Sequence, residues 1–183
     1  MNINKKITLL SLGFILLIII MRLLPHPPNF APANAVALVV GLYSTKNRFG
    51  LFVPLIGVFL ADIIIGFYSL PIMIAVYASY CLIYGIGWLQ RTDNNVIRVS
   101  AATLGSSVLF FAITNYAVWQ FGTMYEHTVS GLSLAYAMAI PFFRNTLASD
   151  ALYTVLLVGV VELVPLFSKS YRLSSPKRES VRT

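Results

Sequence analysis

Apolar residues in this chain follow one another in long runs instead of alternating with polar residues. The longest runs are Ile7–Leu24, Phe49–Phe67, Leu70–Leu89, Val99–Phe121 and Asn145–Phe167. A helix rises about 1.5 Å per residue, so about 20 apolar residues cross the hydrocarbon core of a bilayer. The pattern therefore predicts helices that are apolar on all faces and long enough to cross a membrane.

Two shorter apolar runs complete the pattern. Ala33–Tyr43 lies between the first two long runs, and Leu132–Phe143 precedes the last one. Neither run has the length of a full crossing. We interpret Leu132–Phe143 as a re-entrant or interfacial segment, separate from the helix that begins at Asn145.

The composition agrees with a membrane protein. Of the 183 residues, 58% are hydrophobic and 10% are charged, and the mean hydropathy is +0.80. A soluble domain has about 25% charged residues, so this chain lacks the charges that a water-facing surface needs. The composition excludes a soluble enzyme, a disordered protein and a nucleic-acid-binding protein, although the net charge is +7. The lipid bilayer is the expected partner.

The positions of the basic residues predict the topology. Apart from Arg22 and Arg144, every lysine and arginine falls in the N-terminal segment, in the second or fourth loop, or in the C-terminal tail. The positive-inside rule places these segments in the cytoplasm. Both termini are then cytoplasmic only if Ala33–Tyr43 also crosses, as a short or partly broken helix.

The expected fold is therefore an all-α polytopic membrane helix bundle with six transmembrane helices. Residues 1–167 form a single transmembrane domain, and residues 168–183 form a basic cytoplasmic tail. A signal peptide is the alternative for the N-terminus, because Lys5 and Lys6 precede an apolar stretch and the segment Ala31–Ala33.

Several polar side chains fall within or beside the expected spans, toward the outer half of the bilayer. Asp62 and Asn115 lie near the outer ends of their helices, and Asp150 lies at a similar depth in the last helix. Intramembrane polar residues are costly and point to function. We expect a cavity, open to the outside, that binds a small-molecule solute. The candidate binding residues are His26, Asn29, Asn34, Asp62, Asn115, Trp119, Arg144, Asn145 and Asp150.

Each of these residues also has a structural interpretation. Asp62 or Asp150 can pair with Arg22 or Arg144 and so hold the bundle together. Asn115 can bridge two helices, and Trp119 can belong to an interfacial aromatic belt.

The sequence contains no recognisable catalytic motif and no metal-spaced cluster of Cys and His. We therefore expect no enzyme activity, no cofactor and no metal site. Cys81, the one cysteine, is expected to be a small buried hydrophobic residue, with a soft metal ligand as the alternative. A membrane-embedded enzyme that uses Asp62, Asp150 and His26, and a membrane scaffold or assembly partner, are the alternative functions.

Four groups of residues carry a resemblance. They are Leu24–Ala37, Ala61-Asp62 with Gly66–Tyr68, Thr114-Asn115 with Val118-Trp119, and Ala139–Leu147 with Asp150. They resemble an uncharacterised family of small bacterial integral membrane proteins, which in turn resembles the S-components of energy-coupling-factor (ECF) transporters.

The resemblance implies a multi-pass protein of the bacterial cytoplasmic (inner) membrane with six helices. It also implies capture of a micronutrient, a vitamin or a metal ion, in a cavity that faces outside. The implied partner is an ATP-driven coupling module, against which S-components topple.

The resemblance to S-components includes one departure. S-components typically have an Ala-x-x-x-Ala motif on the first helix for docking, whereas Ile7–Leu24 has only Gly13 in such a role. Small residues at this spacing occur instead at Ala33, Ala37 and Gly41, where we interpret them as helix packing, with a docking face as the alternative. In some S-components that work alone a membrane cysteine contacts cobalt, so Cys81 makes cobalamin a solute to test.

Overall fold

The computed structural model describes residues 3–44, 48–92 and 95–163. The predicted tail, residues 168–183, lies outside the described residues, as does Lys46 of the second loop. The described chain is helical. Its elements are α1 (Ile3–Leu23), α2 (Ala33–Tyr43), the short 3-10 helix η1 (Arg48–Leu51), α3 (Phe52–Ile65), α4 (Leu70–Gln90), α5 (Val96–Phe121) and α6 (Val129–Leu163).

The helices follow the predicted apolar runs with one correction. Leu132–Phe143 is not a separate interfacial segment, because it belongs to α6, a continuous helix of 35 residues. Pro141 lies inside this helix. A proline removes one backbone hydrogen bond, and long apolar helices tolerate that loss where neighbouring groups compensate for it.

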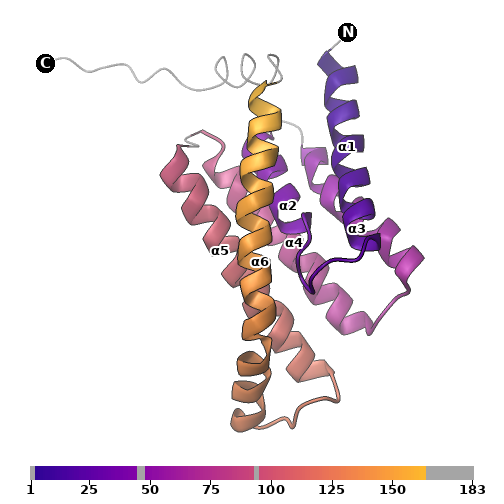
Figure 1. The fold of residues 1–183 in the computed structure, drawn as a ribbon, viewed down its shortest axis with the longest axis vertical. Coiled ribbons are helices and arrows are strands. Elements are labelled where there is room, and N and C mark those ends of the chain that lie inside the picture. The colour runs from indigo at the N-terminus through magenta and orange to yellow at the C-terminus, as the bar shows by residue number, and fades with distance from the viewer. Residues whose placement is uncertain (1–2, 45–47, 93–94, 164–183) are drawn as a thin grey trace, which may run out of the picture.

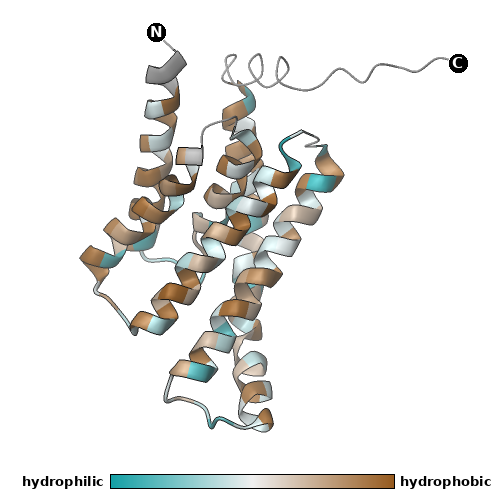
Figure 2. Ribbon diagram, turned by 180° about the vertical axis from the view of Figure 1, so that it is seen from behind, coloured by the Kyte–Doolittle hydropathy of each residue, from teal (hydrophilic) through white to brown (hydrophobic). Residues whose placement is uncertain are grey.

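Three helices, α4, α5 and α6, are long and apolar enough to cross a membrane. The apolar parts of the other three are shorter and span Ile7–Leu23, Ala33–Tyr43 and Phe49–Ile65. Large hydrophobic side chains such as Leu16, Ile64 and Val155 are exposed on the outer faces of the bundle. Figure 2 shows hydrophobic residues along the length of the helices. Such an apolar exterior is typical of a membrane protein.

The first described helix begins, and the last one ends, on the same side of the molecule. In Figure 1, the beginning of α1 and the end of α6 both lie at the top, while the loops that follow α1, α3 and α5 point away from that end. The hairpin of α5 and α6 extends furthest in that direction.

The short helix α2 occupies the interior of the bundle. Every residue of α2 except Val40 is buried, and α2 contacts α3, α4, α5 and α6. Its 11 residues rise only about 16 Å, roughly half of the hydrocarbon core of a bilayer. The centre of the bundle is therefore filled by a helix over only part of its height.

Glycines allow α2 and α4 to touch backbone to backbone. A Cβ atom on Gly41 would lie 2.3 Å from the carbonyl oxygen of Tyr84, and one on Gly87 would lie 2.2 Å from that of Leu38. Ala33 and Ala37 are buried as well. This placement supports the interpretation that the small residues of α2 serve helix packing within the chain.

Candidate functional site

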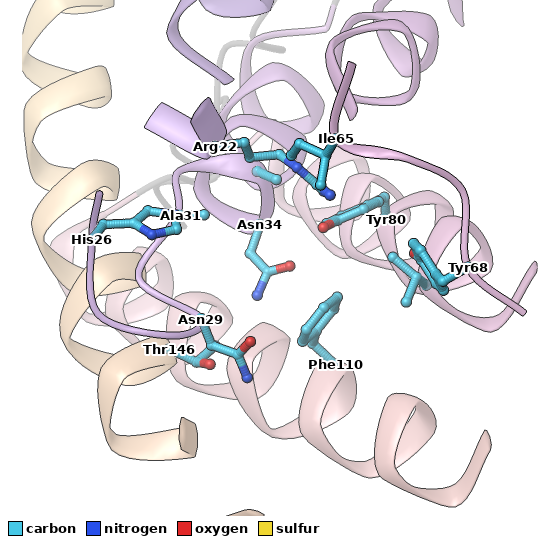
Figure 3. A pocket seen from close by; sticks show the side chains of 12 residues that line it. Arg22, His26, Asn29, Ala31, Asn34, Ile65, Tyr68, Tyr80, Phe110 and Thr146 are labelled. Carbon is cyan, nitrogen blue, oxygen red and sulfur yellow. The ribbon is translucent and has the colours of Figure 1, made fainter. Parts of the chain in front are cut away.

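A cavity of about 310 Å³ lies at the N-terminal end of α2. It is lined by Arg22, His26, Asn29, Ala31, Ala33, Asn34, Ile65, Tyr68, Val76, Tyr80, Phe110 and Thr146. Figure 3 shows these side chains arranged around a central space into which Asn34 extends. We call this space the α2 cavity.

The local sequence explains why the centre of the bundle is open here. The linker between α1 and α2 contains Pro25, Pro27, Pro28 and Pro32. Proline lacks a backbone N–H and restricts the residue before it, so the helix ends at Leu23 and the next one begins only at Ala33. The linker forms one wall of the α2 cavity through its residues between positions 26 and 31.

One residue of the linker and one residue of α6 fix the course of the linker. Asn29 has a φ of 62°, in the left-handed region that asparagine adopts more readily than most residues. The Nδ2 of Asn145 on α6 donates a hydrogen bond to the carbonyl oxygen of Pro28 at 2.9 Å. Asn145, a predicted binding residue, thus anchors the linker rather than lining the cavity.

An ion pair with the buried Asp62 fixes Arg22, which is 20% exposed, in the lining of the cavity. Its Nη2 donates to Oδ1 of Asp62 at 2.5 Å, and the hydroxyl of Tyr77 donates to Oδ2 of the same carboxylate at 2.8 Å. Asp62 is only 1% exposed. The pairing of Asp62 with Arg22 is one of the alternatives that the sequence left open, and it joins the end of α1 to α3 and α4.

A second buried carboxylate lies behind Asn34. The Nδ2 of Asn34 donates to Oδ2 of Asp150 at 3.0 Å, and the hydroxyl of Ser107 donates to the same oxygen at 2.6 Å. Asp150 is 1% exposed, whereas Arg144 is exposed. Within the described ranges no basic side chain contacts Asp150, so its partners differ in kind from those of Asp62.

Aromatic rings form another wall of the cavity. Tyr80 on α4 and Phe110 on α5 stack with ring centroids 5.6 Å apart. Tyr68 lies in the loop between α3 and α4, and burial, reinforced by the nearby Asp62, raises the pKa of Tyr68 to about 12. Tyr68 is therefore an uncharged phenol at neutral pH.

Three predicted binding residues lie elsewhere. The amide of Asn115 donates to the carbonyl oxygen of Phe111 in its own helix at 2.8 Å, and Nε1 of Trp119 donates to that of Glu126 at 2.8 Å. With the exposed Arg144, they are absent from the lining of the α2 cavity. The structure gathers His26, Asn29 and Asn34 in the lining and places Asp62 and Asp150 directly behind it.

Several residues of the site were not predicted from the sequence. Tyr77 and Ser107 bind the two carboxylates, and Tyr80 and Phe110 line the cavity. One signal was available for Ser107, because it lies next to Ser106 and four residues after Thr103, so that Thr103 and Ser107 share a face of the helix. The aromatic residues carry no such signal, since aromatic side chains occur throughout the apolar runs.

The described residues contain no cluster typical of a zinc or other transition-metal site. Across the described segments, no group of three or more His, Cys, Asp or Glu residues could hold a metal ion. Cys81 is partly buried on α4 and does not line the α2 cavity.

The sequence matches one known protein family. The sequence model of a family of unknown function, DUF6580, matches residues 2–174. The chain belongs to this uncharacterised family. No curated protein and no solved structure matches the chain.

Proposed function

We propose that this protein is a multi-pass integral membrane protein that captures a small solute in the α2 cavity, in the manner of an S-component. The observation that carries the proposal is the α2 cavity itself, in which Arg22 and Asn34 are each held by a buried carboxylate. A concave site with a few convergent polar groups among apolar walls is typical of small-molecule binding.

The proposed topology opens the cavity to the outside. Six crossings with cytoplasmic termini, as the basic residues suggest, put the loops after α1, α3 and α5 on the outer side. Two of these loops supply lining residues, among them His26 and Tyr68. The solute therefore enters from the outside and stops at the N-terminal end of α2.

The volume of the cavity limits the size of the solute. A water molecule takes up roughly 30 Å³ in the liquid, so about 310 Å³ holds a molecule with on the order of ten to twenty non-hydrogen atoms. This volume favours a small organic micronutrient over a corrinoid such as cobalamin. The place of Cys81 outside the lining gives a cobalt–thiolate contact no support.

The test is a thermal-shift screen of the purified protein against neutral, anionic and cationic metabolites and metal ions. A solute at one hundred times its Kd stabilises the folded protein by about 2.7 kcal/mol. Ala31→Phe fills the cavity and abolishes the response, whereas Leu9→Phe, on an exposed face of α1, retains it. The proposal fails if no solute stabilises the wild type, or if Ala31→Phe responds as the wild type does.

A further inference from the structure

We propose that Asp150 and the oxygen atoms around it form a binding site for one monovalent cation, sodium, in the interior of the bundle between α2, α5 and α6. This site lies behind the α2 cavity and shares Asn34 with it. It does not depend on the identity of the solute.

The two buried carboxylates of the site differ in their charge balance. Asp62 pairs with Arg22 at 2.5 Å. Asp150 is equally buried, and its hydrogen-bond partners, Asn34 and Ser107, are both neutral. Buried charges in proteins are paired with an opposite charge or bind a metal ion. A cation at Asp150 supplies the charge that Arg22 supplies at Asp62.

Asp150 and residues bonded to it or near it in sequence carry buried oxygen atoms without a hydrogen-bond partner in the described part of the chain. Oδ1 of Asp150, Oδ1 of Asn34 and Oγ1 of Thr154 are buried and accept or donate no hydrogen bond within the part of the chain that the structure describes. Thr154 follows Asp150 by one turn on the same face of α6. Ser106, beside Ser107 on α5, also has a buried, unpartnered hydroxyl.

The orientation of Asn34 leaves its carbonyl oxygen for a cation. A carboxylate only accepts hydrogen bonds, so the Nδ2 of Asn34 must face Asp150 and its Oδ1 must point elsewhere. While Asp150 is ionised, neither this oxygen nor Oδ1 of Asp150 can donate a hydrogen bond to the other. A cation can bind both, because it interacts with lone pairs without requiring a proton.

The donor set selects the kind of cation. Carboxylate, amide and hydroxyl oxygens are hard ligands that suit alkali and alkaline-earth ions. Calcium sites usually combine several carboxylates, whereas Asp150 is the one carboxylate here. One negative charge balances one monovalent ion. The competing occupant is a proton on Asp150, which the experiment separates from sodium.

Asn34 and Thr146 connect the cation site with the α2 cavity. Asn34 contacts Asp150 and lines the cavity, and Thr146 lines the cavity one turn before Asp150. Figure 3 shows both side chains at the cavity. A sodium ion that fixes the Asn34 amide would raise the affinity for the solute, and the solute would raise the affinity for sodium by the same factor. This coupling rests on the proposed function, whereas the sodium site does not.

The experiment measures thermal unfolding of the full-length protein in detergent, without any solute. Choline chloride is replaced by NaCl or KCl at constant ionic strength, so that only the cation changes. We expect a saturable rise of Tm with sodium and a smaller one with potassium. At ten times the Kd for sodium, the equilibrium constant for folding rises about elevenfold. Equilibrium dialysis with radioactive sodium should give one ion per chain.

The variants locate the site. Asp150→Asn and Thr154→Val are expected to lose most of the sodium response, whereas Ser79→Ala, which removes a buried hydroxyl of α4 bonded within its own helix, should retain it. If Asp150→Asn does not fold, Thr154→Val and Ser107→Ala carry the test.

Three outcomes overturn the proposal. Equal melting curves in sodium, potassium and choline exclude a sodium site. A full sodium response in Thr154→Val places the ion elsewhere. A stability that depends on pH through Asp150 but not on sodium assigns the site to a proton. The solute screen is read separately, so solute capture can fail while the sodium site stands, and the reverse.

Discussion

At the scale of single residues, the two buried carboxylates decide how polar groups are held next to the α2 cavity. Asp62 is bound by a charged guanidinium and a phenol, and Asp150 by an amide and a hydroxyl. Both acids therefore act as positioning residues for the groups that line the cavity, Arg22 and Asn34.

The ion pair of Arg22 and Asp62 predicts a non-additive double mutant. Asp62→Leu leaves the Arg22 charge without its partner, and because Arg22 is 20% exposed, the cost should fall below the roughly 3–5 kcal/mol of breaking a fully buried pair. The double variant Arg22→Met/Asp62→Leu removes both charges and should regain much of that loss. Chemical unfolding in detergent measures both. Equal destabilisation of the single and double variants would show that the pair contributes no coupling.

The hydrogen bond from Ser107 to Asp150 predicts a smaller effect. Ser107→Ala removes one hydrogen bond to a charged group, which costs about 1.5–3 kcal/mol. Ser133→Ala is the matched control, because Ser133 is exposed and bonds only within its own helix. Its free energy of unfolding should change by less than about 0.5 kcal/mol. Equal changes in the two variants would contradict the role of Ser107.

The sequence pointed to the polar residues of the site more readily than to its aromatic residues. Asp62, Asp150 and Asn34 stand out because a polar side chain in an apolar run is costly and rare. Asn115 stands out in the same way, yet it bonds to its own helix. Composition and depth in the membrane do not show how a helix is rotated about its own axis. This rotation decides whether a polar side chain of the helix faces the cavity.

At the scale of the elements, the contact of α2 with α4 sets the position of the cavity. The backbones meet at Gly41 and Gly87, and this close approach holds the short helix in the interior, where its N-terminal end forms one boundary of the cavity. Prolines in the linker fix where α2 begins.

This contact predicts opposite outcomes for two glycines of α4. A Cβ at Gly87 would meet the carbonyl oxygen of Leu38, which is backbone and cannot rotate away, so Gly87→Ala should destabilise the protein by about 1–3 kcal/mol or more. A Cβ at Gly85 meets nothing within 4 Å. Gly85→Ala should be neutral or stabilising, because alanine favours helix. Thermal unfolding of both variants checks the prediction, and equal melting temperatures would contradict it.

The sequence predicted the apolar helices, but it also predicted one boundary that the structure does not have. Leu132–Phe143 is too short to cross alone, which favours a separate segment, but α6 continues through it and through Pro141. Residues on both sides of Pro141 contact α5, because the hydroxyl of Tyr136 donates to the carbonyl oxygen of Ala112 and the ring of Phe143 lies against that of Phe111.

At the scale of the whole molecule, the arrangement of helix ends predicts the result of a labelling experiment. In the proposed topology, single cysteines at Leu24, Ser69 and Met124 face outside, and one at Thr92 faces the cytoplasm. In a Cys81→Ala background, a membrane-impermeant maleimide should label the first three in intact cells. Thr92→Cys and a cysteine tag added before Met1 should react only after lysis. Labelling of Thr92→Cys or of the tag in intact cells would contradict six crossings.

The central claim is that the α2 cavity binds the solute. Its most direct test is an experimental structure of the protein with the best solute of the screen bound. The account predicts that the solute lies at the N-terminal end of α2, in contact with Asn34 and between Arg22 and Phe110. A solute bound elsewhere on the protein, or side chains that fill this space in the complex, would contradict it.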